Sequence, residues 1–562
     1  MTVMVKYISC LLFVMFGALY NVNAQDYLIS TPNTSLLLTA KPGEAARIHY
    51  YGTRIEENRI QQIFDSNLAF HSESYPAFGI YSYNDKAMQV THGDGNMSLD
   101  LAVESVKQYT VAEAEITEIL LKDKVYPFFV KQCYKAYKNS DVIGTWVEVT
   151  NQEKKPVTMY KFASAFIPVR RGDNWLTHFH GTWGAENMLQ EERLTDGQKI
   201  IKNEDGVRNT TNENPSFMLT LDGKPQEETG HVFGASLAWS GNYTLKLDVD
   251  NNRIIKIYAG INEDASYYTL DPKKTFVTPE FAMTYSTTGK GGVSRNFHRW
   301  ARMYKLSHAD SDRDILLNSW EGVYFKGDQE VMAQMMKDMS QLGGELFVMD
   351  DGWFGDKYPR DGGSTSLGDW VVCKKKLPQG IEGLIASAKK CGIKFGLWIE
   401  PEMVNSKSEL YEKHPDWIIC QDNRTPTTGR GGTQMILDLS NPKVQDFVFG
   451  VVDNLMTNYP EIAYIKWDAN ASIMNYGSYY LPKDRQSHLY IEYHKGLNNV
   501  LERIRTKYPH LLMQACASGG SRVNYGLLPY FGEFWTSDNT DAYQRIYMQW
   551  GVSNFYPAIA TA

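Results

Sequence analysis

The chain has 562 residues, too many for one ordinary domain, so its length predicts two or three domains. Hydrophobic residues make up 43% and charged residues 22%, a composition that can bury a large core without disulfides. The net charge of −8 gives no reason to expect nucleic acid or an anionic membrane as a partner.

The N-terminus has the pattern of a secretory signal peptide. Lys6 lies in a short charged region, an apolar run covers residues 7–19, and Val22–Ala24 offers a cleavage site before Gln25. The apolar run is too short for a transmembrane helix, and no later segment is long and apolar enough to span a membrane. We therefore expect residues 1–24 to be removed and the mature chain to be exported, either to the periplasm or outside the cell.

The cysteines give no sign of a metal or redox site. Five of the six remain after removal of the predicted signal peptide, an odd number, and no two have Cys-x-x-Cys spacing. We expect most of these thiols to be buried and unreactive.

Residues 25–310 are predicted to form a large antiparallel β-sandwich. Short runs such as Gly144–Thr150 and Tyr243–Val249 alternate apolar with polar residues, and they follow one another without intervening helices. His178 and His180 could suggest a metal site, but two histidines without a third ligand are more typical of a strand face.

From residue 311 to residue 562, strands and helices alternate at a spacing that predicts a parallel sheet and, with six or more units, a (β/α)8 barrel. The predicted strands are residues 315–318, 346–349, 394–399, 463–467, 511–515 and 534–537. No eighth strand or closing helix follows the last unit, so we expect this barrel to be incomplete at its C-terminal end.

The helix after the first predicted strand illustrates the pattern. Val331, Met335, Met339 and Leu342 recur at helical spacing and indicate its apolar face, and Asp328 can cap its N-terminus.

Acidic residues follow the predicted strands directly. In barrels of this type, catalytic groups lie at the C-terminal ends of the strands. Four of five strand ends carry carboxylates, and the residues at the five ends are Asp350-Asp351, Glu400-Pro-Glu402, Lys466-Trp-Asp468, Cys516 and Asp538. This placement predicts an active site built from carboxylates.

Several acids around one pocket, without a metal-ligand cluster or a phosphate-binding glycine loop, fit glycoside hydrolysis, and no cofactor or metal is expected. That reaction needs one ionised and one protonated carboxyl group. Lys466 would favour the ionised form of Asp468, as a nucleophile requires. Asp538 lies beside Trp535 and Ser537, where partial desolvation could keep its proton. The alternative reading of Lys466 and Asp468 is an ion pair inside the barrel.

Six segments resemble glycoside hydrolase family 36, chiefly its α-galactosidases, in family order across residues 312–562. They are Asn318-Ser-Trp-Glu-Gly, Met349-Asp-Asp-Gly-Trp-Phe-Gly, Gly396-Leu-Trp-Ile-Glu-Pro-Glu-Met-Val, Leu437-Asp-Leu-Ser, Lys466-Trp-Asp-Ala-Asn and Trp535-Thr-Ser-Asp-Asn-Thr-Asp-Ala. The preceding sandwich also fits this family, whose members normally continue into a smaller C-terminal β domain.

The resemblance implies a retaining α-galactosidase that releases terminal α-linked galactose from oligosaccharides through a covalent galactosyl-enzyme. Asp468 would be the nucleophile and Asp538 the general acid/base. Asp350 and Asp351 resemble the pair that binds the 4- and 6-hydroxyls of galactose. The other sugar-binding positions implied by the resemblance are Trp398 as a pocket wall, Arg430 and Lys466 as polar contacts, and Cys516 and Gly519 near the 2-position.

Departures from the family pattern leave related activities open. Asn524 stands where the family usually has Asp, while Ser518 and Ser521 add bulk to a glycine-rich loop, which bears on the space around the 2-hydroxyl. The alternatives are an α-N-acetylgalactosaminidase, a β-L-arabinopyranosidase or a galactosyl transferase on the same scaffold, and more remotely a non-catalytic sugar-binding protein. A homo-oligomer is also left open.

Overall fold

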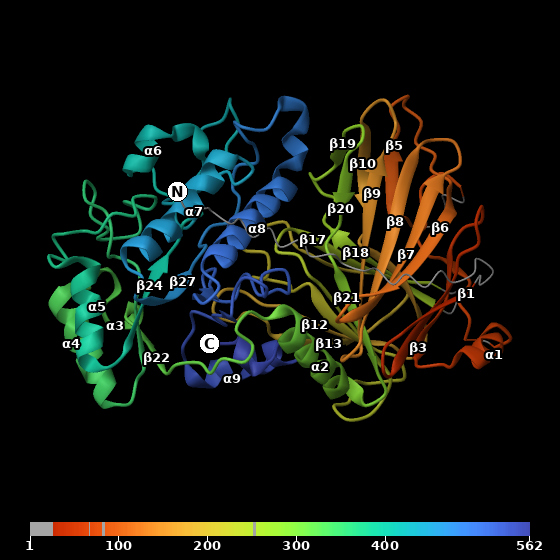
Figure 1. The fold of residues 1–562 in the computed structure, drawn as a ribbon, viewed down its shortest axis with the longest axis horizontal. Helices are drawn as coiled ribbons and strands as arrows, with labels where there is room; N and C mark the ends of the chain where they lie inside the picture. Colours follow the sequence, from red (N-terminus) through yellow and green to blue (C-terminus); the bar gives the residue numbers. More distant parts are fainter. Residues whose placement is uncertain (1–25, 67, 81–84, 251–253) are drawn as a thin grey trace, which may run out of the picture.

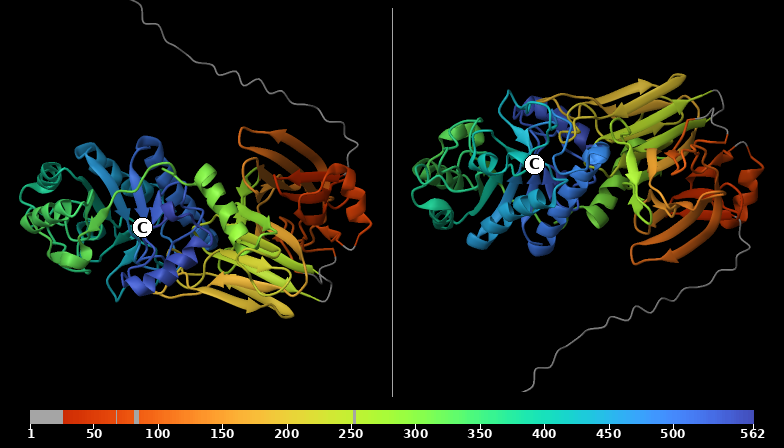
Figure 2. Two further views of the ribbon diagram at one scale, coloured as in Figure 1. Left: turned by 90° about the horizontal axis from the view of Figure 1, so that it is seen from below. Right: turned by 90° about the horizontal axis from the view of Figure 1, so that it is seen from above.

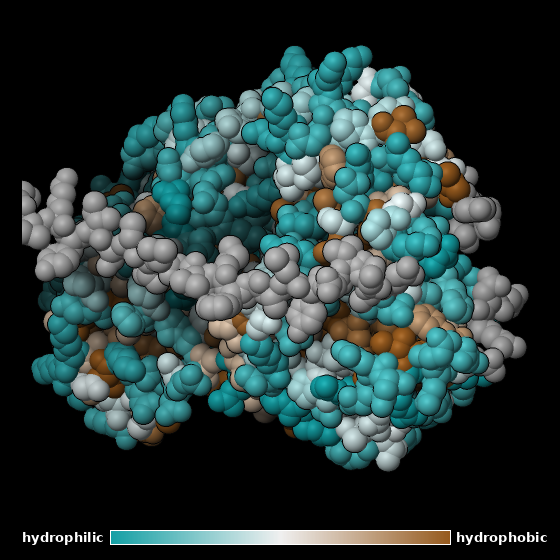
Figure 3. All heavy atoms as spheres, turned by 45° about the vertical axis from the view of Figure 1, so that its right-hand side comes forward, coloured by the Kyte–Doolittle hydropathy of each residue, from teal (hydrophilic) through white to brown (hydrophobic). Residues whose placement is uncertain are grey.

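The computed structural model describes residues 26–562 except 67, 81–84 and 251–253. The predicted signal peptide lies outside these residues, so export stays a prediction. Within the described ranges, no helix combines the length and the apolar character needed to cross a membrane. The face shown in Figure 3 is mainly hydrophilic, with hydrophobic side chains in small groups.

Two parts lie side by side along the long axis of the molecule (Figures 1 and 2). The sandwich part, residues 26–286, consists almost entirely of strands, and the barrel part, residues 316–562, alternates strands with helices. Helix α2 (Gly289–Trp300) and helix α8 (Leu489–Lys507) lie where the two parts meet. This order confirms the predicted fold class, whereas the exact division at residue 310 stays a prediction.

All strand pairs of the sandwich part are antiparallel, as predicted. The ten-stranded sheet contains β13 (Leu189–Arg193), β12 (Trp175–Phe179), β15 (Ser216–Thr220), β16 (Val232–Leu237), β21 (Phe281–Ser286), β9 (Val142–Asn151), β8 (Phe128–Tyr137), β7 (Ala114–Asp123) and β6 (Leu101–Thr110), with β20 (Thr275–Val277) on β9. A four-stranded sheet contains β11 (Ala165–Arg170), β18 (Ile254–Ile261), β17 (Tyr243–Val249) and β14 (Gly197–Lys202).

Two smaller sheets complete the sandwich part. One contains β19 (Tyr268–Leu270), β10 (Val157–Phe162) and β5 (Met88–Thr91), and the other contains β1 (Asp26–Ser30), β2 (Thr34–Thr39), β3 (Arg47–Thr53) and β4 (Ser72–Glu73). The short helices η1 (Glu57–Arg59) and α1 (Ile60–Phe64) lie between β3 and β4 in the chain. Val147 of β9, Phe233 of β16 and Leu245 of β17 belong to one buried cluster, so the sheets share a core. The alternating pattern read from the sequence reflects this burial of one strand face.

His178 and His180 both lie against glutamate carboxylates. His178 Nε2 lies 3.1 Å from Glu192 Oε1, and His180 Nδ1 lies 2.9 Å from Glu213 Oε1. In the part of the chain that the structure describes, no group of three His, Cys, Asp or Glu side chains could hold a metal ion. The five cysteines in that part are free, and four are buried.

The barrel part contains six parallel strands that curl as a half-barrel. In order along the sheet they are β22 (Leu316–Asn318), β23 (Leu346–Met349), β24 (Lys394–Ile399), β27 (Ile462–Trp467), β28 (Leu512–Ala515) and β29 (Glu533–Phe534). Phe534 also forms an isolated parallel bridge with Thr561.

The helices of the barrel part cover the outside of the sheet (Figure 1). Besides α8 they are α3 (Trp320–Val323), α4 (Gln329–Gln341), α5 (Gly380–Cys391), α6 (Glu409–Lys413), α7 (Pro442–Asn458) and α9 (Ala542–Ser553). Shorter elements are η2 (Ala301–Lys305), η3 (Tyr324–Lys326), η4 (Pro415–Trp417), η5 (Lys483–His488), η6 (Ala558–Ala560) and the antiparallel pair β25 (Met403–Val404) and β26 (Met435–Ile436).

The predicted limits of α4 are confirmed, but its predicted apolar face is wrong. The Asp328 carboxylate caps the helix by accepting from two main-chain amides. Met332 and Met336 are buried with Met339, whereas Val331 is 37% and Leu342 89% exposed. The helix carries two overlapping apolar stripes, and packing against the sheet selects the methionine stripe.

The last predicted strand, residues 534–537, is also too long, because β29 ends at Phe534. The Trp535 amide still donates to Ala515 O of β28 at 2.9 Å, but Ser537 and Asp538 bond to side chains of the sandwich part instead of to a neighbouring strand.

A buried ion pair fixes the loop after β24 to the loop after β28. Arg522 donates two hydrogen bonds, of 2.8 and 3.1 Å, to the two oxygens of Glu402. Trp467 and Tyr493 donate to the same carboxylate at 2.7 and 2.6 Å. Every donor is buried, so the Glu402 charge depends on these four bonds.

We expect Arg522→Ala to lower the free energy of unfolding of the barrel part by about 3–5 kcal/mol, because it leaves a buried carboxylate without its cation. The control is Lys389→Ala, which breaks an exposed pair with Glu461 and should cost less than about 1 kcal/mol. Urea unfolding followed by tryptophan fluorescence measures both. Equal losses for the two variants would contradict this account of Glu402.

Candidate active site

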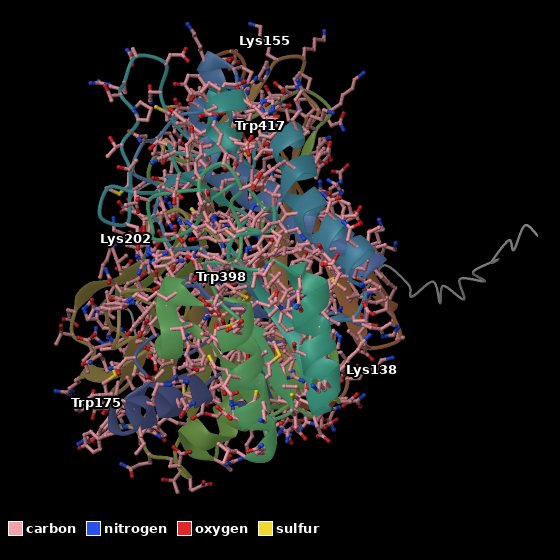
Figure 4. The ribbon with its side chains drawn as sticks, turned by 90° about the vertical axis from the view of Figure 1, so that its left-hand side faces the viewer. Lys138, Lys155, Trp175, Lys202, Trp398 and Trp417 are labelled. Atoms are coloured by element: carbon pink, nitrogen blue, oxygen red, sulfur yellow. The ribbon has the colours of Figure 1, made fainter. Side chains whose placement is uncertain are left out.

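The C-terminal ends of the parallel strands bring the predicted acids to one edge of the sheet. Asp350 follows β23, Asp468 follows β27, Cys516 follows β28, and Asp538 lies four residues after the end of β29. Trp398 of β24 lies opposite Lys466 of β27 in the ladder. Figure 4 shows Trp398 near the centre of the molecule.

Asp468 is buried and receives hydrogen bonds on both carboxylate oxygens. Oδ2 accepts from Trp398 Nε1 at 3.2 Å and from Asn470 Nδ2 at 2.8 Å. Oδ1 accepts from the amides of Ala469 and Ser518 at 2.9 and 3.2 Å. Burial alone would raise the pKa of Asp468, but Lys466, Arg430 and these bonds outweigh it and hold that pKa below its ordinary value. Asp468 is therefore ionised.

Asp538 is only half-buried and lies between two indole rings. Trp535 Nε1 donates to its Oδ1 and Trp183 Nε1 to its Oδ2, each at 3.2 Å. Desolvation, followed by the charge of Asp468, raises the pKa of Asp538 above its ordinary value. The pKa values of Asp468 and Asp538 are thus shifted in opposite directions.

Lys466 links the predicted sugar-binding pair to Asp468. Its Nζ donates to Asp350 Oδ2 at 2.9 Å and lies 5.7 Å from the centre of the Trp535 ring. Asn318 Nδ2 donates to the same Asp350 oxygen at 2.7 Å. Although burial opposes its charge, the neighbouring carboxylates raise the pKa of Lys466. The lysine therefore stays charged.

Asp351 has a partner that the sequence did not reveal. Arg360, which is fully buried, donates to Asp351 Oδ1 at 2.9 Å and to Oδ2 at 2.8 Å. This bidentate pair fixes the plane of the carboxylate. Arg360 comes from the long loop after β23, where no periodic pattern predicts a contact.

Trp398 and Arg430 occupy different surroundings. Trp398 is buried and acts as a hydrogen-bond donor to Asp468, a contact more specific than the predicted pocket wall. Arg430 keeps 37% of its side chain exposed, and its Nη1 lies 3.8 Å from Glu400 Oε2. Glu400 is fully buried, and burial, then Asp468, raise its pKa to about 8.

Cys516 and Gly519 also lie at this edge. Burial, followed by the charge of Asp468, raises the pKa of the Cys516 thiol, so it is protonated. Gly519 has φ +88°, and a Cβ there would lie 2.6 Å from the Asp538 amide nitrogen. Only glycine fits this position. Ser518, one of the departures from the family pattern, donates its Oγ to Asn470 Oδ1 at 2.6 Å, and buried Asn524 donates to Arg522 O.

The sandwich part contributes side chains that the sequence reasoning missed. The loop between β12 and β13 brings Trp183 and Glu186 against the end of β29, more than 350 positions away in sequence. Trp183 is 61% exposed, whereas Glu186 is completely buried. No local signal could have predicted this contact, because it arises from the docking of the two parts.

A separate groove of about 830 Å³ lies on the outer wall of the barrel part, between α5 and α7. Its lining includes Trp370, Trp417 and Phe447 but none of the predicted site residues. The aspartates with opposed pKa shifts, Asp468 and Asp538, do not line this groove. We therefore assign the candidate active site to the strand ends.

Comparison with known proteins gives two adjoining family matches. Residues 44–271 match the glycosyl hydrolase family 36 N-terminal domain, and residues 275–562 match the family described as melibiase. The α-galactosidase AgaA of Geobacillus stearothermophilus is 34% identical over 505 residues, which are 87% of this chain and 68% of AgaA. The α-galactosidase Mel36A of Lactobacillus acidophilus is 32% identical over 559 residues, covering 95% of this chain and 75% of Mel36A.

A solved structure is similar over nearly the whole chain. The crystal structure of an AgaA variant in complex with stachyose superposes with a TM-score of 0.89 at 31% identity, and covers 95% of this chain and 78% of AgaA.

Proposed function

Because the chain belongs to glycoside hydrolase family 36, we propose that it is a retaining α-galactosidase with Asp468 as nucleophile and Asp538 as general acid/base. The relatives named above are α-galactosidases, and one was solved with the oligosaccharide stachyose, which supports α-galactoside oligosaccharides as substrates. The reaction would proceed by attack of Asp468 on the anomeric carbon while Asp538 protonates the leaving oxygen. Asp538 would then activate the water that hydrolyses the galactosyl-enzyme.

The observation that carries this proposal is the opposite direction of the pKa shifts at the two aspartates. Lys466 and Arg430 hold the pKa of Asp468 low, so this carboxyl group is ionised, as a nucleophile must be. Burial and the charge of Asp468 raise the pKa of Asp538, which is the direction that a general acid requires. The surroundings thus move the pKa values of two carboxyl groups of the same kind apart, as this reaction requires.

Selectivity for galactose is proposed to rest on Asp350 and Asp351. Arg360, Lys466 and Asn318 fix both carboxylates, so their oxygens cannot turn to follow a misplaced hydroxyl. In a glucoside the 4-hydroxyl points elsewhere and leaves a desolvated charge without its partner. Sites built on such bonds reject the wrong sugar by about 10⁴-fold.

A panel of aryl glycosides tests the proposed function. We expect α-galactosides to be cleaved with a kcat/KM at least about 10⁴-fold above that for α-glucosides. Faster cleavage of α-N-acetylgalactosaminides or β-L-arabinopyranosides, or transfer to an acceptor sugar in place of hydrolysis, would favour the related activities. The absence of turnover on the whole panel would instead support a sugar-binding protein.

The two proposed roles predict different consequences for substitution. Asp468→Ala should abolish turnover of every substrate, because no leaving group can replace the nucleophile. Asp538→Ala should retain the first step on activated aryl galactosides, which leave without a proton, and lose about 10²–10⁴-fold on raffinose-type substrates. Steady-state kinetics on both substrates measure the difference. Labelling by a fluorinated galactosyl inhibitor at a residue other than Asp468 would contradict the assignment.

The charge of Arg430 should affect the pH dependence of kcat/KM. Asp468 must be ionised to attack, so kcat/KM falls as the pH drops through its pKa. Arg430→Met removes a cation that lowers this pKa, and the acidic limb of the profile should therefore move to higher pH. Arg424→Met, on an exposed part of the same loop, is the matched control and should leave the limb in place. A limb unmoved by Arg430→Met would show that the arginine does not act on the nucleophile's charge.

A further inference from the structure

One carboxyl group at the active-site edge has no role in the proposed reaction. Glu186 belongs to the sandwich part, is completely buried, and lies against the turn that carries Asp538. Its Oε2 accepts a 2.5 Å hydrogen bond from Ser537 Oγ, while its Oε1 has no hydrogen-bond partner among the described residues. A buried carboxyl group with an unpaired oxygen is costly, so its retention needs an explanation.

The hydrogen bonds around Glu186 hold the two residues that flank Asp538 in the chain, Ser537 and Asn539. Ser537 Oγ donates to Glu186 and also accepts from the amide of Asn539 at 3.1 Å. Asn539 Nδ2 in turn donates to the carbonyl of Gly184 at 2.9 Å. Residues 537 and 539 are therefore both tied to the segment 183–186, and Asp538 is held between them.

The packing around this contact leaves no room for adjustment. A Cβ on Gly519 would lie 2.5 Å from Glu186 Oε1 and 2.6 Å from the Asp538 nitrogen. The glycine thus lets the Glu186 carboxyl group and the Asp538 main chain approach the same small volume from the two parts. Such close contact transmits any displacement of Glu186 to the turn.

We propose that Glu186 is a positioning residue that orients the Asp538 carboxyl group through Ser537, so that the sandwich part sets the geometry of proton donation. This inference rests on the proposed function of Asp538. It concerns the acid alone, since the four hydrogen bonds to the nucleophile Asp468 described above all come from the barrel part.

The surroundings of Glu186 oppose its ionisation. Desolvation raises the pKa of Glu186, hydrogen bonding from Ser537 opposes the rise, and the charge of Asp538 adds to it. Arg545 also faces Glu186, and burial lowers the pKa of that arginine. Glu186→Gln keeps nearly the same shape without a negative charge, and its side-chain carbonyl oxygen can still accept from Ser537.

The test uses the leaving-group dependence of kcat/KM in the full-length protein. Glu186→Ala and Ser537→Ala should each lower kcat/KM on raffinose at least about tenfold, because a misplaced acid protonates poorly. On an activated aryl α-galactoside, kcat/KM of the same variants should stay within about twofold of the value for the unmodified enzyme. Glu186→Gln should restore both values, and the double variant Glu186→Ala/Ser537→Ala should be no worse than either single one.

Thr210→Val is the matched control for loss of contact between the two parts. Thr210 of the sandwich part donates to Gly520 O at 2.9 Å and accepts from the Val523 amide at 2.8 Å, but it does not touch the turn 537–539. Thr210→Val should change kcat/KM by the same factor on raffinose and on the activated aryl α-galactoside. Melting temperatures check that each variant is folded.

Three results would overturn the inference: equal losses on both substrates for Glu186→Ala, no loss at all, or additive losses in the double variant. Asp538→Ala on the same substrates separates this inference from the proposed function. If Asp538→Ala shows no leaving-group dependence, the proposed acid is wrong. If it does and Glu186→Ala does not, only the positioning role fails.

Discussion

The active-site edge depends on one buried cation, Lys466. Removing an ammonium group from water costs several kcal/mol, so its position requires carboxylates nearby. Asp350 accepts a direct hydrogen bond from the ammonium group, and Asp468 lies two residues after the lysine in sequence. The lysine lowers the pKa of Asp468, and the resulting negative charge raises the pKa of Asp538. Arg430 adds to the effect of the lysine on Asp468, and desolvation is the larger cause of the raised pKa of Asp538.

Much of this site could be predicted from the sequence because its acids follow short apolar strands. Parallel strands put their C-terminal ends at one edge, so the positions of Asp350, Asp468 and Asp538 followed from the alternation of strands and helices. The hydrogen bond from Trp398 to Asp468 could not be predicted in this way, since it depends on the register between β24 and β27. Arg360 was missed for a related reason, as it lies in an irregular loop.

The errors have a common physical cause. The α4 helix offers two apolar stripes, and only its contact with the sheet decides which one is buried. The segment after Phe534 reads as a strand, but Ser537 donates to Glu186 and Asp538 accepts from Trp183, so both residues bond to the sandwich part. In both cases tertiary contacts override a local preference that is worth little by itself.

The two proposed catalytic aspartates make different demands on the fold. An ionised nucleophile needs fixed donors and nearby positive charge, and the barrel part alone provides these for Asp468. A protonated acid needs partial removal from water, and for Asp538 the two indole donors come one from each part. The sandwich part thus supplies one of the two hydrogen bonds to the acid, whereas the hydrogen bonds to the nucleophile come from the barrel part. A β-sandwich far from the strand ends in sequence thus becomes part of the active site in space.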